Sequence, residues 1–206
     1  MTLAQIVAAY IRDHRRDARV EAKGFRQLPS LKEAIRRAAL CHRFPDGKRH
    51  SHQCRIPLAT LADAERRLQN ASEALSAAAD FQVLHHTVDR EIGKIRGIGE
   101  LCVYDIAHRI GAFRGLKPTL VYVHRGTRDG ARILRFKGNT LDPKQLPAAF
   151  SRLTPAEIED CLCIYKNALA SDHFRTRVLH HASSCNYTRK NRVRKCCRPC
   201  GNSGLA

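Results

Sequence analysis

Two glycines separated by one apolar residue, Gly97-Ile98-Gly99, lie between two stretches of the chain with helical periodicity. Apolar residues occur at helical spacing on both sides of them: Ile92, Ile95, Val103, Ile106 and Ile110. A connection this short predicts unusual backbone angles and a close approach of another backbone, which is why glycine is expected twice. The pattern therefore predicts two helices joined by a tight turn. The second helix would begin with unpaired amides and a positive dipole end facing outward, which is a site for a phosphate.

The rest of residues 1–170 also favours a mainly α fold, a helical bundle with the hairpin at about 88–114. Ser30 and Glu33 have the spacing of a capping box, and Thr154-Pro155-Ala156-Glu157 combines a cap, an early proline and a box glutamate. The helix that follows Thr154 has an apolar face of Ile158, Cys161, Leu162 and Tyr165. Helices are predicted over residues 2–22, 30–41, 57–70, 72–79 and 81–94, a polar loop over 42–56, and one short strand at Leu120–Val123.

Helical periodicity ends after Ala170, and residues 171–206 are basic and rich in cysteine. This segment holds eight Lys and Arg residues against one acid. We expect it to be either a disordered tail or a small zinc-binding unit appended to the helical domain.

A formal charge of +18 indicates a polyanionic partner, with nucleic acid ahead of an anionic membrane surface. The chain has five Tyr, seven Phe and no Trp, which argues against a base-stacking RNA-binding sheet. No apolar run approaches the roughly 18 residues of a membrane span, and the first residues do not form a convincing secretory signal. A cytoplasmic protein with reduced thiols is expected.

The segment 92–107 resembles the helix-hairpin-helix motif of DNA repair and recombination proteins, whose turn amides hold backbone phosphates of duplex DNA without reading sequence. Val103 departs from the family pattern, which usually has alanine there, and Glu100 would repel a phosphate. The DNA glycosylases of this superfamily imply a catalytic lysine two positions after the second glycine and an aspartate further on. Leu101 and Tyr122 hold these positions here, so the resemblance supports a phosphate grip and not base excision.

Basic residues near the hairpin and in the tail are the candidate nucleic-acid contacts. Arg125, Arg128 and Arg132 follow His124 in a glycine-containing segment predicted as a turn, and Arg128 and Arg132 would share a face if it were helical. The predicted binding residues are Arg96, Gly97, Ile98, Gly99, Arg125, Arg128, Arg132, Arg189, Lys190, Arg192, Arg194 and Lys195. Asp105, Asp129, His108 and His124 are isolated polar residues and are expected to be structural.

Two clusters have residue types that bind zinc. Cys197-Arg-Pro-Cys200-Gly201 has the form of a zinc knuckle, and Cys185 with His180 or His181 would complete it. The set His181, Cys185, Cys197 and Cys200 is the stronger prediction, with a basic tail or a redox-active cysteine pair as alternatives. The loop set Cys41, His42, His50, His52 and Cys54 matches no standard finger, and a polar surface loop is the simpler reading.

These observations favour a non-enzymatic protein that binds DNA without sequence preference, with RNA as a possible partner. The first alternative is a glycosylase-like or nuclease-like repair enzyme whose catalytic residues the sequence does not identify. The second is a scaffold in which the hairpin contacts another protein and the charge serves solubility.

Overall fold

The computed structural model describes residues 1–170 and confirms a mainly α protein. Ten α-helices, three short 3-10 helices and one two-stranded antiparallel ladder make up this part of the chain. The α-helices are α1 (Leu3–Asp13), α2 (Arg15–Arg26), α3 (Leu31–Ala39), α4 (Leu58–Asn70), α5 (Ser72–Ala77), α6 (Phe81–Ile92), α7 (Glu100–Arg114), α8 (Arg125–Ile133), α9 (Pro155–Ile164) and α10 (Lys166–Ala170). The 3-10 helices are η1 (Ser51–Gln53), η2 (Pro143–Gln145) and η3 (Ala148–Arg152), and the strands are β1 (Val121–Tyr122) and β2 (Thr140–Leu141).

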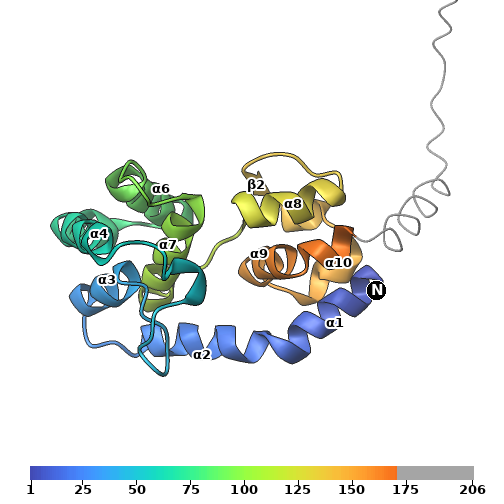
Figure 1. Ribbon diagram of the computed structural model, residues 1–206, viewed down its shortest axis with the longest axis horizontal. Helices are drawn as coiled ribbons and strands as arrows, with labels where there is room; N and C mark the ends of the chain where they lie inside the picture. The colour runs from blue at the N-terminus through green and yellow to red at the C-terminus, as the bar shows by residue number, and fades with distance from the viewer. Residues whose placement is uncertain (171–206) are drawn as a thin grey trace, which may run out of the picture.

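The helices form two lobes, each with its own apolar core (Figure 1). The first lobe contains α3 to α7, and its core includes Leu61, Leu68, Leu84, Ile106 and Ile110, all fully buried. The second lobe contains α8 to α10 with β1 and β2, and its core includes Val121, Phe150, Ile158 and Leu162. Burial of each such side chain stabilises the fold by about 1.5–3 kcal/mol, so each lobe has its own source of stability.

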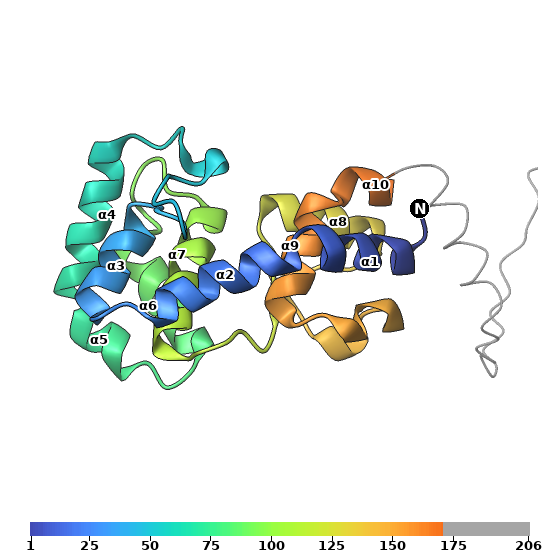
Figure 2. The same cartoon turned by 90° about the horizontal axis from the view of Figure 1, so that it is seen from below.

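Helices α1 and α2 run along the long axis of the molecule and contact both lobes (Figure 2). Ile6, Val7 and Tyr10 of α1 are buried in the second core, whereas Phe25 of α2 is buried in the first. The sequence predicted one helix over residues 2–22, and this is wrong in two respects. The helix is interrupted at His14, whose φ of −125° is not helical, and α2 continues to Arg26. The break lets the two halves turn their apolar faces to different cores.

Other predicted elements agree closely with the structure. Thr154 and Glu157 form both hydrogen bonds of a capping box at the start of α9. Ser30 caps α3 through the amide of Glu33, but the Glu33 carboxylate pairs with Arg36 and Arg37, so only half of this predicted box forms. Ile158, Cys161 and Leu162 of the predicted apolar face are buried, whereas Tyr165 is the C-cap of α9 and only half-buried. The predicted strand pairs as β1, with Val121 opposite Leu141 and Tyr122 opposite Thr140.

The segment after His124 differs from the prediction of a turn, because it forms the helix α8. Gly130 of α8 lies where this helix contacts α9. A Cβ at this position would lie 2.5 Å from the backbone oxygen of Leu162, so glycine allows α8 to pack directly on α9.

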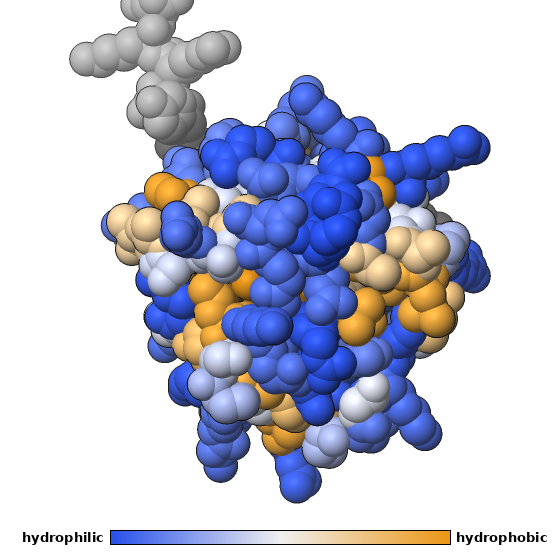
Figure 3. All heavy atoms as spheres, turned by 90° about the vertical axis from the view of Figure 1, so that its left-hand side faces the viewer, coloured by the Kyte–Doolittle hydropathy of each residue, from blue (hydrophilic) through white to orange (hydrophobic). Residues whose placement is uncertain are grey.

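Hydrophilic side chains cover much of the end of the first lobe, with apolar patches between them (Figure 3). No helix within residues 1–170 combines the length and the apolar character that crossing a membrane requires.

Candidate nucleic-acid interface

The turn between α6 and α7 spans residues 93–99, with Gly97 and Ile98 in its second half. Gly97 has a φ of +97°, a region that side-chain-bearing residues rarely adopt, so glycine is required here as predicted. Ile98 is buried in the first core, and its amide donates to the carbonyl of Ile95 over 2.9 Å. The apolar residue between the glycines therefore anchors the turn to the lobe.

Gly99 is different, and the expectation that the turn geometry requires both glycines is wrong for this residue. Its φ of −109° and ψ of 173° are extended values that any residue adopts. A Cβ built at Gly99 meets no atom within 4 Å. Nothing inside the described chain requires glycine at this position, and the space in front of its Cα is open.

Gly99 is the N-cap of α7 and provides no side-chain hydrogen bond to the helix. The first α7 hydrogen bond runs from the amide of Val103 to the carbonyl of Gly99, over 3.1 Å. The amides of Glu100, Leu101 and Cys102 have no hydrogen-bond partner within residues 1–170. Gly97, Gly99 and Glu100 are exposed, so this helix end presents donors and a positive dipole to the outside.

Three cations of the turn and of α8 are not neutralised by the protein. Lys94 and Arg96 belong to the turn itself, and Arg125 begins α8. All three are exposed, and none forms an ion pair with an acid of the described chain. Lys94 was not among the predicted contacts, because the sequence placed it at the end of the predicted helix over residues 81–94, whereas α6 ends at Ile92.

The two other arginines predicted to bind nucleic acid are paired with carboxylates. The Nη2 of Arg128 lies 3.1 Å from Glu100 and donates to the carbonyl of Val123 over 3.3 Å. Arg128 thus connects α8 of the second lobe to the start of α7 in the first. Arg132 is largely exposed, and its Nη1 lies 4.0 Å from Asp129. The structure therefore brings Arg128 to the start of α7, but there its charge is paired with Glu100.

A cavity of about 530 Å³ opens beside Glu100, between α6, α7 and the β1–β2 ladder. Aromatic rings line much of it: His85 and Tyr122 have ring centroids 4.5 Å apart, and those of Tyr104 and Tyr122 are 5.5 Å apart. Burial lowers the pKa of His85 and raises the pKa of Tyr104 well above its usual range. Both rings are consequently neutral at physiological pH, and the cavity wall is uncharged over this part.

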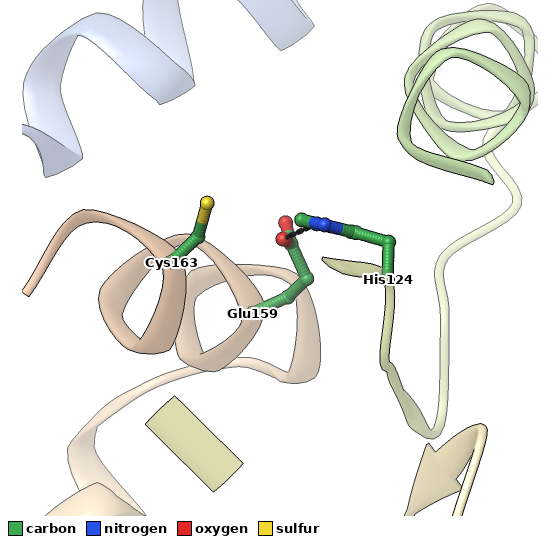
Figure 4. A group of neighbouring side chains, drawn as sticks. All are labelled: His124, Glu159 and Cys163. Carbon is green, nitrogen blue, oxygen red and sulfur yellow. Dashed lines mark hydrogen bonds and ion pairs between the residues drawn. The ribbon is translucent and has the colours of Figure 1, made fainter. Parts of the chain in front are cut away.

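A buried polar group lies where β1 leads into α8. His124, Glu159 and Cys163 converge there, with one potential ligand atom of each within 4.8 Å of the others (Figure 4). The Nε2 of His124 contacts Oε1 of Glu159, and the hydroxyl of Thr127 donates to the same carboxylate over 2.8 Å. Burial raises the pKa of Glu159 although the contact with His124 opposes this, and burial raises the pKa of Cys163 to about 11.

This group is the one cluster of three or more His, Cys, Asp or Glu side chains with metal-binding spacing in residues 1–170. From the sequence, His124 is an isolated residue, and Glu159 and Cys163 are not among the predicted ligands. The spacing of Glu159 and Cys163, four residues apart, places them on one face of a helix and was a usable signal. Their proximity to His124 depends on the packing of α8 on α9, which the sequence does not show.

The histidine-rich loop does not form the metal site considered from the sequence. Cys41 is buried and contacts Cys102, whereas Cys54 is exposed. The ring of His50 lies 2.9 Å from Glu21, and that of His52 lies 2.9 Å from Asp105. The loop histidines are thus held by carboxylates of α2 and α7. Both carboxylates also lie close to Arg109, which is buried on α7.

Several predicted residues lie outside the described part of the chain. They are the basic residues Arg189, Lys190, Arg192, Arg194 and Lys195 and the proposed zinc ligands His181, Cys185, Cys197 and Cys200.

No protein-family model, curated protein or solved structure matches this chain.

Proposed function

We propose that this protein binds the phosphate backbone of duplex DNA through the N-terminus of α7, without reading base sequence. The observation that carries the proposal is the open space at Gly99 in front of three unpaired amides. The backbone angles of Gly99 do not require glycine, and no neighbour excludes a Cβ there, so the space beside this N-cap is free for a ligand. Glycine would let a phosphate approach the amides closely, as in the helix-hairpin-helix motif that this segment resembles.

The surrounding charge fits a polyanionic ligand. Lys94, Arg96 and Arg125 are exposed and unpaired within the described chain, so phosphate binding would not break an existing ion pair. Backbone amides and flexible cations recognise phosphate and sugar, which are common to all sequences. Binding is therefore expected to be independent of sequence and to weaken steeply as salt increases.

The experiment is a fluorescence-anisotropy titration of a labelled random-sequence duplex with the full chain and its Gly99→Ala variant, at 200 mM salt. The added methyl group would occupy the phosphate position. Each hydrogen bond to a charged group contributes about 1.5–3 kcal/mol, so loss of one or two predicts at least about tenfold weaker binding. Stability is expected to change by less than about 0.5 kcal/mol, because a weaker N-cap offsets a less flexible unfolded chain.

Gly115→Ala is the matched control, at the other end of the same helix. Gly115 has a φ of +75°, so alanine there is strained by about 1–2 kcal/mol while leaving the N-terminus of α7 unchanged. The control should lose stability but keep its affinity for DNA, the reverse of Gly99→Ala. Equal affinity of Gly99→Ala and the unmodified chain would refute the proposal. It would favour the hairpin as a contact for another protein.

A further inference from the structure

We infer that His124, Glu159 and Cys163 bind one Zn²⁺ ion in the second lobe. Imidazole nitrogen, carboxylate oxygen and thiolate sulfur are the donors that zinc uses in proteins. All three come from well-defined elements: Glu159 and Cys163 project from one face of α9, and His124 is the N-cap residue of α8 (Figure 4). The site is separate from the amides of α7, and the inference does not depend on DNA binding.

Hydrogen bonding within the protein leaves this group incompletely satisfied. Nδ1 of His124 is buried and has no hydrogen-bond partner. The thiol of Cys163 also has no partner within residues 1–170, although it lies within 4.8 Å of the imidazole and carboxylate. Glu159 is 4% exposed and has no lysine or arginine beside it in the described chain. Buried polar atoms without partners are rare, and burying a carboxylate without a cation is costly. A bound cation would neutralise Glu159 and give the thiol of Cys163 a partner.

The backbone of α8 at Gly126 lies close to the sulfur of Cys163. A Cβ at Gly126 would lie 2.7 Å from Sγ of Cys163 and 3.7 Å from Cε1 of His124. Glycine therefore leaves room for the thiol next to the imidazole. The hydroxyl of Thr127 donates a hydrogen bond to the carboxylate of Glu159. Hydrogen bonds of this kind fix the orientation of metal-ligating carboxylates in proteins.

Three protein donors leave one position of a tetrahedral ion for a water molecule. His124 also lines the cavity beside Glu100, so solvent has a route to the group. An ion here would join the start of α8 to the middle of α9 and stabilise the second lobe by binding only the folded chain.

The test is a titration with Co²⁺, which reports sulfur ligation by a thiolate-to-metal charge-transfer band. It uses the full chain with Cys185, Cys196, Cys197 and Cys200 changed to serine, because those cysteines would bind the ion themselves. We expect one equivalent of Co²⁺ with the charge-transfer band, and displacement of the ion by Zn²⁺. Cys163→Ser should abolish the band, and Glu159→Gln should weaken Co²⁺ binding at least tenfold.

Cys54→Ser in the same background is the matched control, since Cys54 is an exposed cysteine of the histidine-rich loop. It should retain the band and the one-to-one stoichiometry. Zn²⁺ should also raise the midpoint of thermal unfolding of the control but not of Cys163→Ser. The inference is overturned by the absence of a band at millimolar Co²⁺, or by a band that survives Cys163→Ser.

Discussion

Glu100 is the one acidic side chain in the first turn of α7, directly beside the unpaired amides. A carboxylate at a helix N-terminus stabilises the helix by about 0.3–1 kcal/mol, but it also competes with an incoming phosphate. Its contact with Arg128 reduces this competition, because the two charges neutralise each other. The same contact keeps Arg128 occupied in the free protein. Glu100 thus lowers the strength of the proposed DNA grip while connecting the two lobes.

Glu100→Gln should bind duplex DNA about two- to fivefold more tightly, because removing a charge at a helix terminus changes the energy by about 0.3–1 kcal/mol. Anisotropy titrations at 100 mM salt would measure this increase. Asp129→Asn is a suitable control, since Asp129 is an exposed acid of α8 and pairs with Arg132 rather than Arg128. Weaker DNA binding by Glu100→Gln would place the phosphate away from the start of α7.

Helices α2 and α7 are held together with the histidine-rich loop through charged side chains. Arg109 of α7 is 5% exposed and lies 3.3 Å from Glu21 of α2. Burial raises the pKa of Asp105, but the hydrogen bond with His52 and the charge of Arg109 outweigh it, so the pKa lies below the usual value. Burial also raises the pKa of Glu21. Contacts with His50, the amide of Phe44 and Arg109 outweigh burial, so this pKa is lowered as well. The loop is therefore tied to two helices by ionised groups.

Both carboxylates have folded-state pKa values below their unfolded values. They contribute stability that is present above about pH 4 and is lost as the pH falls through the lowered values. Removing one member of a buried charge network typically costs about 3–5 kcal/mol; these carboxylates are partly exposed, so Arg109→Met should cost about 2–4 kcal/mol at pH 7. The difference in free energy of unfolding between Arg109→Met and the unmodified chain should become smaller at pH 3, because the carboxylates take up protons there.

Urea denaturation at pH 7 and pH 3 would measure both differences. Arg67→Met provides the comparison, because Arg67 forms a more exposed pair with Asp63 on α4. Exposed pairs of this kind contribute about 0.3–0.5 kcal/mol, so this variant should change little at either pH. An Arg109→Met variant as stable as the unmodified chain at pH 7 would contradict the network.

Under the proposed function, the molecule as a whole has two sources of affinity for DNA: the turn before α7 and the basic residues 171–206. They differ in physical character. Amides at a helix end bind one phosphate at short range, whereas eight lysines and arginines act through counterion release. The two contributions can be separated by their salt dependence.

Removal of residues 171–206 should weaken binding at low salt and reduce the slope of log K against log salt. Each lost phosphate contact lowers the slope by about 0.9. Titrations of both chains between 50 and 300 mM salt would give the slopes. The effect of Gly99→Ala should persist in the shorter chain, because the amides of α7 belong to residues 1–170. Loss of all measurable binding on truncation would assign the affinity to the tail.

Local patterns in the sequence were sufficient to predict most of the helices. The capping box at Thr154, the cap at Ser30, and the positive φ at Gly97 follow from interactions within a few residues. The break at His14 was not predictable in this way, because the two helices on either side of it bury side chains in different cores, and the division into two cores is not visible in the local pattern.

The sequence alone determined a basic, mainly helical chain with a glycine turn before α7. These properties depend on composition and on spacings shorter than two helical turns. Only the tertiary structure decided that Gly99 faces open space, that Arg128 meets Glu100, and that His124 meets Glu159 and Cys163. The reason is that each of these relations joins parts of the chain through the packing of α7, α8 and α9, and contacts between distant segments leave no periodic signal in the sequence.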